Sequence, residues 1–217
     1  MIRQDGNTVR TERTRRRILD ESLKLFNDQG EDAVTTADIA GSLGISPGNL
    51  YYHFRNKDQI VAELFGRLEA RLDIDPRVGP DVAQSIEDLW FYLHLMLEAI
   101  WDFRFFYRNL HGLARRDRRL RDRFNRIASR KLAAIEALCE ALAAQGALAA
   151  SREEIRALAR NVLLVATYWL DFQSLRPGRE RSAGLGQGAY QVMALVAPYL
   201  VGGARAHLER LGRSYVE

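Results

Sequence analysis

Hydrophobic positions recur with helical spacing along the whole chain. Nowhere do four or more β-branched residues alternate with polar ones, as a half-buried strand would require. The spacing predicts an all-α protein of about nine helices, over approximately residues 11–29, 35–44, 46–54, 56–71, 89–101, 103–113, 117–145, 151–174 and 189–211.

Start and stop signals support these boundaries. Thr35 and Asp38 form a capping box, in which each side chain accepts from the other residue's free backbone N–H. Ser46 is suited to cap the next helix, and Pro47 fits its first turn because a missing N–H costs nothing there. Further start signals are Asn56 with Gln59 and Ser151 with Glu154, and glycines follow three predicted helix ends, at Gly30, Gly44 and Gly146.

The stretch DIDPRVGPD, residues 73–81, interrupts the helical pattern with two prolines and a glycine. We therefore predict a first domain over residues 1–72 and a second over residues 73–217. In the second domain, the helix LWFYLHLMLEAIW is apolar nearly all round, so we expect other helices to enclose it. The stretch RPGRERSAGLGQG, residues 176–188, predicts a loop.

Composition excludes several classes of protein. A chain of 217 residues with 47% hydrophobic content can bury a sizeable core. The single cysteine cannot form an internal disulfide, and the four histidines give no zinc-ligand spacing, so neither a metal nor a cofactor is expected. The first residues lack the apolar core of a signal peptide, and no apolar run approaches the roughly 18 residues of a membrane span. We expect a cytoplasmic protein with no membrane contact.

Charge is unevenly distributed. Residues 1–64 carry nine Lys/Arg and ten Asp/Glu, a net of −1, whereas residues 104–131 carry eleven Lys/Arg and two Asp/Glu, a net of +9. The basic run in residues 104–131 is either a solvated helix face or a surface that lies near a polyanion, and the sequence leaves both open.

The segment GISPGNLYYHFRNKDQI, residues 44–60, contains the chemistry of a nucleic-acid reader. Two short helices joined across a glycine turn form a helix-turn-helix, whose second helix enters the DNA major groove. Ser46 and the free N–H groups beside it suit phosphate, Gly48 permits close approach, and Asn49 is suited to face bases or backbone. Leu50 and Phe54, four residues apart, should point towards the first helix.

The remaining side chains of that helix are then expected to point outward. Tyr51, Tyr52 and His53 would offer hydroxyl and imidazole groups to phosphates and ring faces to thymine methyls. Lys57, at the start of the next helix, would clamp a further phosphate. Five arginines near the start of the first helix would set a local positive field despite the net charge of −1: Arg10, Arg13, Arg15, Arg16 and Arg17.

Over roughly residues 10–66, the stretch TTADIAGSLGISPGNLYYHFRNKDQIVAELF and the preceding TRRRILDESLKLF resemble the DNA-binding domain of the tetracycline-repressor (TetR) family. The resemblance implies a three-helix helix-turn-helix domain followed by a helical domain that binds an inducer and dimerises through its last two helices. Many family members have lysine where this chain has Pro47, which removes one charge here. Carried over residue by residue, the DNA contacts are Thr36, Ser46, Pro47, Gly48, Asn49, Tyr51, Tyr52, His53 and Lys57.

The function implied is that of a ligand-responsive transcriptional regulator. We expect a homodimeric repressor that binds double-stranded DNA at a near-palindromic operator. It would leave the operator when a small, mostly apolar inducer binds. The dimer would use LARNVLLVATYWL and YQVMALVAPYLV, with Val192 or Val196 facing the partner. Candidate ligand-binding residues on the helices that enclose the ligand in this family are Trp90, His94, Trp101, Tyr107, His111, Tyr168, Trp169, Asp171 and Phe172.

Each of these aromatic residues also fits ordinary core packing. His94 and Asp171 would need partners if buried, and a few polar groups in an aromatic cavity are typical of small-molecule sites. The alternative that keeps the fold is a helical protein-interaction adaptor that does not bind DNA. Salt-dependent binding to DNA separates the two, because each phosphate contacted releases counterions.

No enzyme is expected. Gly44 to Gly48 matches the G-x-S-x-G pattern of a hydrolase, but a helix precedes the serine where a hydrolase has a strand. Pro47 also lacks the N–H that an oxyanion hole would need at that position. The glycines of GLGQG follow no strand and therefore form no dinucleotide fingerprint.

Overall fold

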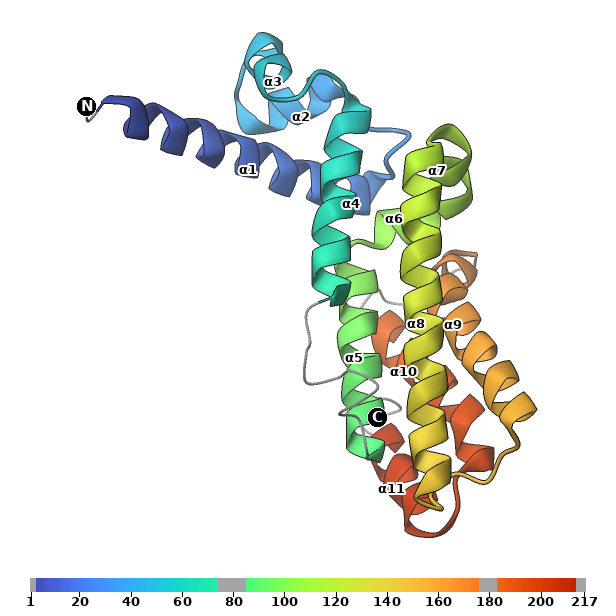
Figure 1. Cartoon of the computed structure of the whole chain (residues 1–217). Helices are drawn as coiled ribbons and strands as arrows, with labels where there is room; N and C mark the ends of the chain where they lie inside the picture. The colour runs from blue at the N-terminus through green and yellow to red at the C-terminus, as the bar shows by residue number, and fades with distance from the viewer. Residues whose placement is uncertain (1–2, 74–84, 176–182, 214–217) are drawn as a thin grey trace. The chain divides into compact units, whose positions relative to one another are not determined.

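The computed structural model describes residues 3–73, 85–175 and 183–213 (Figure 1). These residues form eleven α-helices and one 3₁₀ turn, with no strand beyond a single antiparallel bridge between Leu148 and Leu200. The predicted all-α class is confirmed. The chain divides into two compact units, residues 1–71 and 72–217.

The first unit contains α1 (Arg3–Gln29), α2 (Thr36–Leu43), α3 (Pro47–His53) and most of α4 (Lys57–Asp73). Helix α1 begins eight residues before the predicted start, because its polar, arginine-rich first turns carry no apolar stripe for periodicity to detect. Gly44 joins α2 to α3 with a φ of +64°, a conformation that glycine adopts without strain. This turn makes α2 and α3 a helix-turn-helix.

Helix α3 has only seven residues, so it depends on packing for its stability. Leu50 and Phe54 are fully buried, and α3 packs on α1 and α2. The prediction that these two side chains point inward is confirmed. The same core contains Ile18 and Phe26 of α1 and Ile39 of α2, all at most 1% exposed.

The predicted caps are confirmed. Thr35 and Asp38 form the capping box of α2, and the hydrogen bonds from Thr35 lower the pKa of the Asp38 carboxyl. The Ser46 side chain accepts from the backbone N–H of Asn49, at 3.2 Å. The start of α9 has the second predicted box, between Ser151 and Glu154.

The second unit contains α5 (Ile86–Asp102), α6 (Arg104–Arg108), α7 (Leu110–Arg116), α8 (Arg118–Ala144), α9 (Arg152–Ser174), α10 (Ala183–Val196) and α11 (Gly202–Arg213). Helix α9 packs against both α8 and α10, and α5 packs on α10 and α11 (Figure 1). The helix predicted over 103–113 is two short helices. The one predicted over 189–211 is interrupted by a 3₁₀ turn, Ala197–Tyr199, because Pro198 has no N–H for a continuous helix.

Two predictions for this unit were wrong. Helix α10 begins at Ala183, so the glycines of GLGQG are helical. A Cβ on Gly188 would lie 2.8 Å from Trp169 Cδ1, so this glycine allows α10 to approach α9 closely. Helix α5 is not fully enclosed, because it buries one face while Phe91 remains 37% exposed. Of the predicted breaks, residues 74–81 and 176–182 lie outside the described residues.

A third correction concerns the proposed dimer contacts on α10. Val192 is 1% exposed and Val196 2% exposed, so both belong to the core of their own protomer. Neither side chain is placed to face a partner. A charge at either position would disrupt the protomer itself.

The packing of α3 predicts a large effect of Phe54→Ala. Removing this fully buried ring should lower the free energy of unfolding by about 3 to 5 kcal/mol, because it leaves a cavity beneath the helix. Urea unfolding followed by far-ultraviolet circular dichroism measures the change. Tyr52→Ala, on the same helix but 76% exposed, is the matched control and should shift stability by less than about 0.5 kcal/mol. Equal losses in the two variants would contradict the anchoring role.

Candidate nucleic-acid interface and ligand cavity

The start of α3 presents an open polar surface. Ser46, Pro47, Gly48 and Asn49 are all exposed. The nearest atom to a Cβ built on Gly48 is Ser46 Oγ, at 4.0 Å, so the helix surface at this point is free for close approach. The Ser46 hydroxyl accepts the capping bond and keeps its own proton for a further acceptor.

Two tyrosines extend this surface. Tyr51 is 51% exposed and Tyr52 is 76% exposed, confirming that both rings point outward. The Tyr51 hydroxyl lies 3.1 Å from Thr36 Oγ1, so one hydrogen bond links α3 to the first turn of α2. Seven of the nine predicted DNA contacts, residues 36, 46–49, 51 and 52, therefore gather on one side of the helix-turn-helix.

His53 does not point outward, which corrects the sequence prediction. The residue is only 9% exposed, and its ring meets that of Tyr52 edge-on with the centroids 5.1 Å apart. Burial, and then the nearby Arg15 guanidinium, lower the pKa of the imidazole. His53 is therefore placed to support Tyr52 from inside.

Lys57 is likewise not placed as a phosphate clamp. Its ammonium donates to the carbonyls of Glu31 and Val34, at 2.7 and 3.1 Å, and lies 3.0 Å from the Glu31 carboxylate. The Glu31 side chain is fully buried. Lys57 thus ties the loop after α1 to the start of α4, and its charge is already neutralised by a partner.

Arg15 was predicted to contribute to the exposed basic cluster, but it points into the unit. Its guanidinium donates to the His53 carbonyl at 2.7 Å, pairs with Glu63 of α4 and lies 4.3 Å from the centre of the Phe54 ring. The other four arginines of the cluster, residues 10, 13, 16 and 17, are exposed. The sequence held a signal for the inward direction of Arg15, because helical spacing places it on the same stripe of α1 as the buried Ile18 and Phe26.

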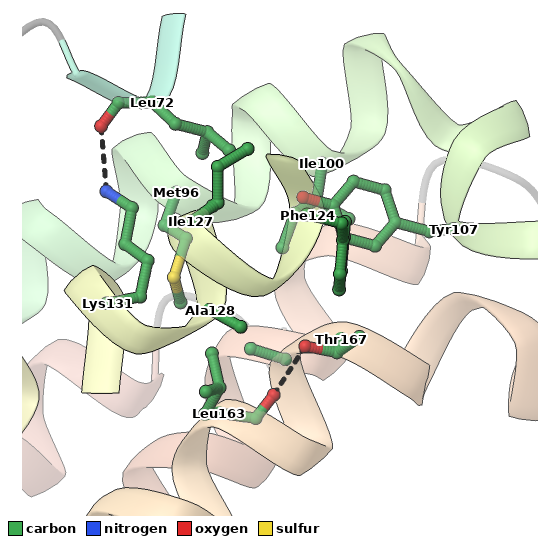
Figure 2. Close-up of a pocket in the computed structure, with 11 residues that line it drawn as sticks. Leu72, Met96, Ile100, Tyr107, Phe124, Ile127, Ala128, Lys131, Leu163 and Thr167 are labelled. Carbon is green, nitrogen blue, oxygen red and sulfur yellow. Dashed lines mark hydrogen bonds between the residues drawn. The ribbon is translucent and has the colours of Figure 1, made fainter. Parts of the chain in front are cut away.

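The second unit contains a narrow cavity, shown in Figure 2. Its volume is about 20 Å³, room for roughly one water molecule. The walls are mainly apolar side chains of α5, α8 and α9, joined by Tyr107 of α6 and by Leu72, which the contacts assign to this unit. The polar residues at the cavity are Tyr107, Lys131 and Thr167.

The polar groups of the cavity differ in their hydrogen bonds and in their pKa values. Thr167 Oγ1 donates to the carbonyl of Leu163 at 2.7 Å, within α9. Burial raises the pKa of the Tyr107 phenol, and Figure 2 shows its hydroxyl end directed towards the cavity. Burial also lowers the pKa of Lys131 to about 8, although Asp73 opposes this shift.

The structure does not bring all nine predicted ligand residues together. Tyr107 lines the cavity, whereas Tyr168, Trp169 and Phe172 together line a separate groove between α9 and α10. Trp90 stacks on His94, with ring centroids 5.4 Å apart, and His94 lies 3.3 Å from Glu98 on the same helix. Trp101 is half-buried, and its ring lies 5.1 Å from the Arg104 guanidinium.

The other five candidates lie elsewhere in the second unit. His111 is exposed on α7, and Asp171 is half-buried on α9. Trp169 packs against Gly188, as described above. Tyr168 and Phe172 are each 49% exposed on the outer face of α9.

Lys131 was missed as a cavity residue. Its signal was its position midway between Ile127 and Ile135, at four-residue spacing, both of which are buried. A lysine on the apolar stripe of a helix must either extend to solvent or find a partner inside. Because Lys131 lies within the basic run of residues 104–131, the sequence did not distinguish it from the other basic residues of that run.

The described residues contain neither a metal-binding cluster nor a helix suited to cross a membrane. No group of three or more His, Cys, Asp or Glu side chains is arranged to hold a metal ion in that part of the chain. No helix in the described ranges is both long enough and apolar enough to cross a membrane.

Comparison with known families matches both units. The family "Bacterial regulatory proteins, tetR family" matches residues 18–64, and "Bacterial transcriptional repressor" matches residues 66–208. Together these matches cover the helix-turn-helix and most of the second unit. The chain belongs to the TetR family.

Solved TetR structures share the fold. A TetR-family transcriptional regulator from Marinobacter aquaeolei is 40% identical, with a TM-score of 0.81 over 93% of this chain and 98% of that one. PfmR from Thermus thermophilus is 22% identical, with a TM-score of 0.65 over 82% of this chain and 96% of that one. A regulator from Saccharomonospora viridis, solved in complex with choline, is 21% identical with a TM-score of 0.61, over 88% of this chain and 99% of that one.

Curated TetR-type relatives match over a short segment. The repressor KstR2 from Mycolicibacterium smegmatis is 42% identical over 64 residues, which are 26% of this chain and 31% of that protein. The regulator AcrR from Shigella flexneri is 34% identical over 59 residues, 27% of each chain. The chain thus spans less than a third of the length of either relative.

The internal position of Lys57 predicts that Lys57→Met damages stability. Removing the ammonium leaves the Glu31 carboxylate buried without its cation, which should lower the free energy of unfolding on the order of 3 kcal/mol. Urea unfolding measures the loss. The double variant Glu31→Gln/Lys57→Met removes both charges and should recover part of it. If Lys57→Met unfolds at the same urea concentration as the parent, the ammonium does not stabilise the fold. The predicted role of Lys57 in binding a DNA phosphate would then be favoured again.

Proposed function

We propose that this chain is a homodimeric transcriptional repressor. It binds a near-palindromic operator through α2 and α3 and is released when a small, mostly apolar inducer enters the second unit. The observation that carries the proposal is the exposed face formed by Thr36, the first turn of α3, Tyr51 and Tyr52. The second helix of a helix-turn-helix enters the DNA major groove, and the match of residues 18–64 to a family of bacterial regulatory proteins supports that role for this face.

The chemistry of this face supports DNA recognition by uncharged groups. Hydroxyls of Thr36, Ser46 and Tyr51 suit phosphate oxygens, and the Asn49 amide suits a phosphate or a base edge. The Tyr52 ring offers a face to a thymine methyl group and a hydroxyl to the backbone. His53 and Lys57 support this face from inside, by contacts within the unit.

The outer surface of α9 and α10 supports dimerisation. Leu164 is 57% exposed and Tyr168 and Phe172 are each 49% exposed, and their four-residue spacing makes one stripe along α9. Tyr190 of α10 is 42% exposed. These two helices also line an apolar groove of about 390 Å³. A second copy that packs the same face would bury it in a four-helix arrangement.

Inducer binding is proposed for the cavity beside Tyr107 and Lys131. A relative with the same fold, the Saccharomonospora viridis regulator, was solved with choline. The present cavity is lined mainly by apolar side chains with a few polar groups, as small-molecule sites are. At about 20 Å³ it must widen to admit an inducer, and this widening would couple the ligand to the rest of the unit.

Tyr52→Ala tests the DNA interface. Loss of an exposed contact residue should weaken operator binding by about 1 to 3 kcal/mol without changing the fold. Fluorescence anisotropy on the DNA upstream of the chain's own gene, at several salt concentrations, gives the affinity and its salt slope. His53→Gln is the comparison, since its buried ring should affect stability more than the salt slope. A parent protein that binds no duplex at low salt would favour the protein-interaction adaptor.

Leu164→Glu tests the dimer. A carboxylate at the centre of the α9 stripe would be buried unpaired in the dimer, so we expect a monomer at micromolar concentration while the parent sediments as a dimer. Val9→Glu, at an exposed apolar position in the first unit, should leave the dimer intact. Sedimentation velocity distinguishes the two masses. A dimeric Leu164→Glu protein would move the interface away from α9.

A further inference from the structure

Lys131 links the wall of the cavity to the end of α4. The residue lies on the buried stripe of α8, and its Nζ donates to the carbonyl oxygen of Leu72 at 2.8 Å (Figure 2). The same nitrogen lies 4.8 Å from the centre of the Tyr92 ring. All three residues belong to the second unit.

The carbonyl that Lys131 binds is one that a helix cannot satisfy by itself. Helix α4 ends at Asp73, so the Leu72 carbonyl is among the last four, which have no N–H partner within the helix. A cation at a helix C-terminus both donates to such a carbonyl and offsets the negative end of the helix dipole. The adjacent Arg130 pairs with the Asp73 carboxylate at 3.1 Å. Two neighbouring cations of α8 therefore bind the last two residues of α4, Leu72 and Asp73, both in the second unit.

The ammonium of Lys131 retains capacity for another partner. It has three N–H donors, and within the described residues one hydrogen bond is formed, to Leu72. The side chain is largely buried in an apolar wall, where a positive charge is disfavoured, as its lowered pKa of about 8 reflects. An anion at this position would restore the stability of the charged form.

We infer that the cavity takes an amphipathic anion, whose apolar chain lies among Met96, Phe124 and Leu163 and whose acidic head pairs with Lys131. The head group competes with the Leu72 carbonyl for the ammonium, so ligand binding releases the carbonyl of Leu72 near the end of α4. This inference rests on the proposed function, because it names the ligand class of the proposed inducer cavity. A carboxylate and a phosphate monoester share the required chemistry.

Cationic and neutral ligands fit less well. A cationic head would face the ammonium of Lys131 with Arg130 beside it, and a neutral alcohol would add no negative charge to that of Asp73, which only partly offsets the burial of the ammonium. The closed cavity must open for any such chain. Met96 and Lys131 have the long, unbranched side chains that can move aside. Leu72 both lines the cavity and provides the competing carbonyl. An entering chain therefore also displaces the residue that the hydrogen bond from Lys131 holds; we call this hydrogen bond the latch.

A set of eight-carbon probes tests the head group. Octanoate, octyl phosphate, octanol and octylamine are titrated into the full-length protein while the fluorescence of Trp90, Trp101 and Trp169 is followed, all three of which lie in the second unit. Octanoate or octyl phosphate should bind at least tenfold more tightly than octanol, and octylamine should bind least. The comparison of the two anions identifies which head group is preferred. Equal affinity for octanol and for both anions would overturn the inference, as would no binding of either anion at millimolar concentration.

Variants locate the contact. Lys131→Met should lose tenfold or more in affinity for the preferred anion and leave octanol unchanged, whereas Arg130→Met, next to it on α8, should lose less than threefold. Lys131→Arg keeps the charge and should retain most of the affinity if Lys131→Met proves unstable. Parent-like anion binding by Lys131→Met would overturn the inference.

The pH dependence gives a readout that needs no variant. The groups facing the ammonium are Asp73 of α4, Arg130 of α8 and Tyr92 of α5. With a free-state pKa of about 8, Lys131 is largely protonated at pH 7 and largely neutral at pH 9. Affinity for the anion should therefore fall about tenfold over that interval, while affinity for octanol stays constant. A flat profile for the anion would exclude Lys131 as its partner.

Amide exchange tests the latch, and operator binding keeps the two proposals apart. Saturating anion should speed hydrogen exchange at the backbone amides of Leu72 and Asp73, and Lys131→Met should show the faster rate without ligand. Unchanged exchange in both cases would overturn the latch. If the ligand-free protein binds no operator DNA, the proposed function fails; if it binds DNA but shows no preference for the anions, only the ligand inference fails.

Discussion

A helix of seven residues cannot hold its own conformation in water, and the position of α3 is therefore the constraint on which the proposed DNA-reading face depends. Leu50 and Phe54 supply the buried contacts. Arg15 completes the support, because it donates to the carbonyl of His53, the last residue of α3, while its guanidinium lies over Phe54 and pairs with Glu63. One side chain of α1 thus connects the end of α3 to α4.

Cations donate to backbone carbonyls at other places among the described residues as well. Arg15 donates to the end of α3, Lys57 to the carbonyls of Glu31 and Val34 after α1, and Lys131 to the end of α4. Arg15 and Lys131 donate at helix ends, where carbonyl oxygens lack an N–H partner within the helix, and Lys57 donates in a turn whose Glu31 carbonyl also accepts from the Val34 N–H. A partly buried cation in such a place gives a carbonyl oxygen a hydrogen-bond donor in the interior.

These hydrogen bonds from cations to carbonyls also explain what the sequence could and could not predict. Helix positions, caps and the inward direction of Leu50 and Phe54 follow from local spacing, and all were confirmed. The direction of a long charged side chain depends on which carbonyl it can reach in the folded chain. Lys57 was therefore assigned to a phosphate and Arg15 to a basic cluster that sets a positive field, although both side chains bind within the first unit. For the same reason the sequence did not show that Lys131, within a run of basic residues, points inward to the Leu72 carbonyl.

The ligand site was harder to predict for a different reason. Aromatic residues on α5 and α9 have the same helical spacing whether they face a cavity, a neighbouring helix or a second protomer. Trp169 packs on a glycine of α10, Tyr168 lies on the outer face of α9 and Tyr107 lines the cavity, yet all three are aromatic residues in amphipathic helices. Only the contacts between helices separate these roles.

Because Arg15 and Lys57 bind within the first unit, they add no positive charge to the proposed DNA-reading face. Once Arg15 and Lys57 are bound within the unit, the face formed by Thr36, the first turn of α3 and the two tyrosines holds hydroxyls, an amide and aromatic rings, with no lysine or arginine among them. Uncharged groups of this kind select by geometry, since their hydrogen bonds and ring contacts require a matching base edge or phosphate position. Charge that attracts DNA at longer range would then come from exposed arginines outside this face, on α1 and at Arg55. In the proposed function, the first unit thus separates this attraction from recognition by α3.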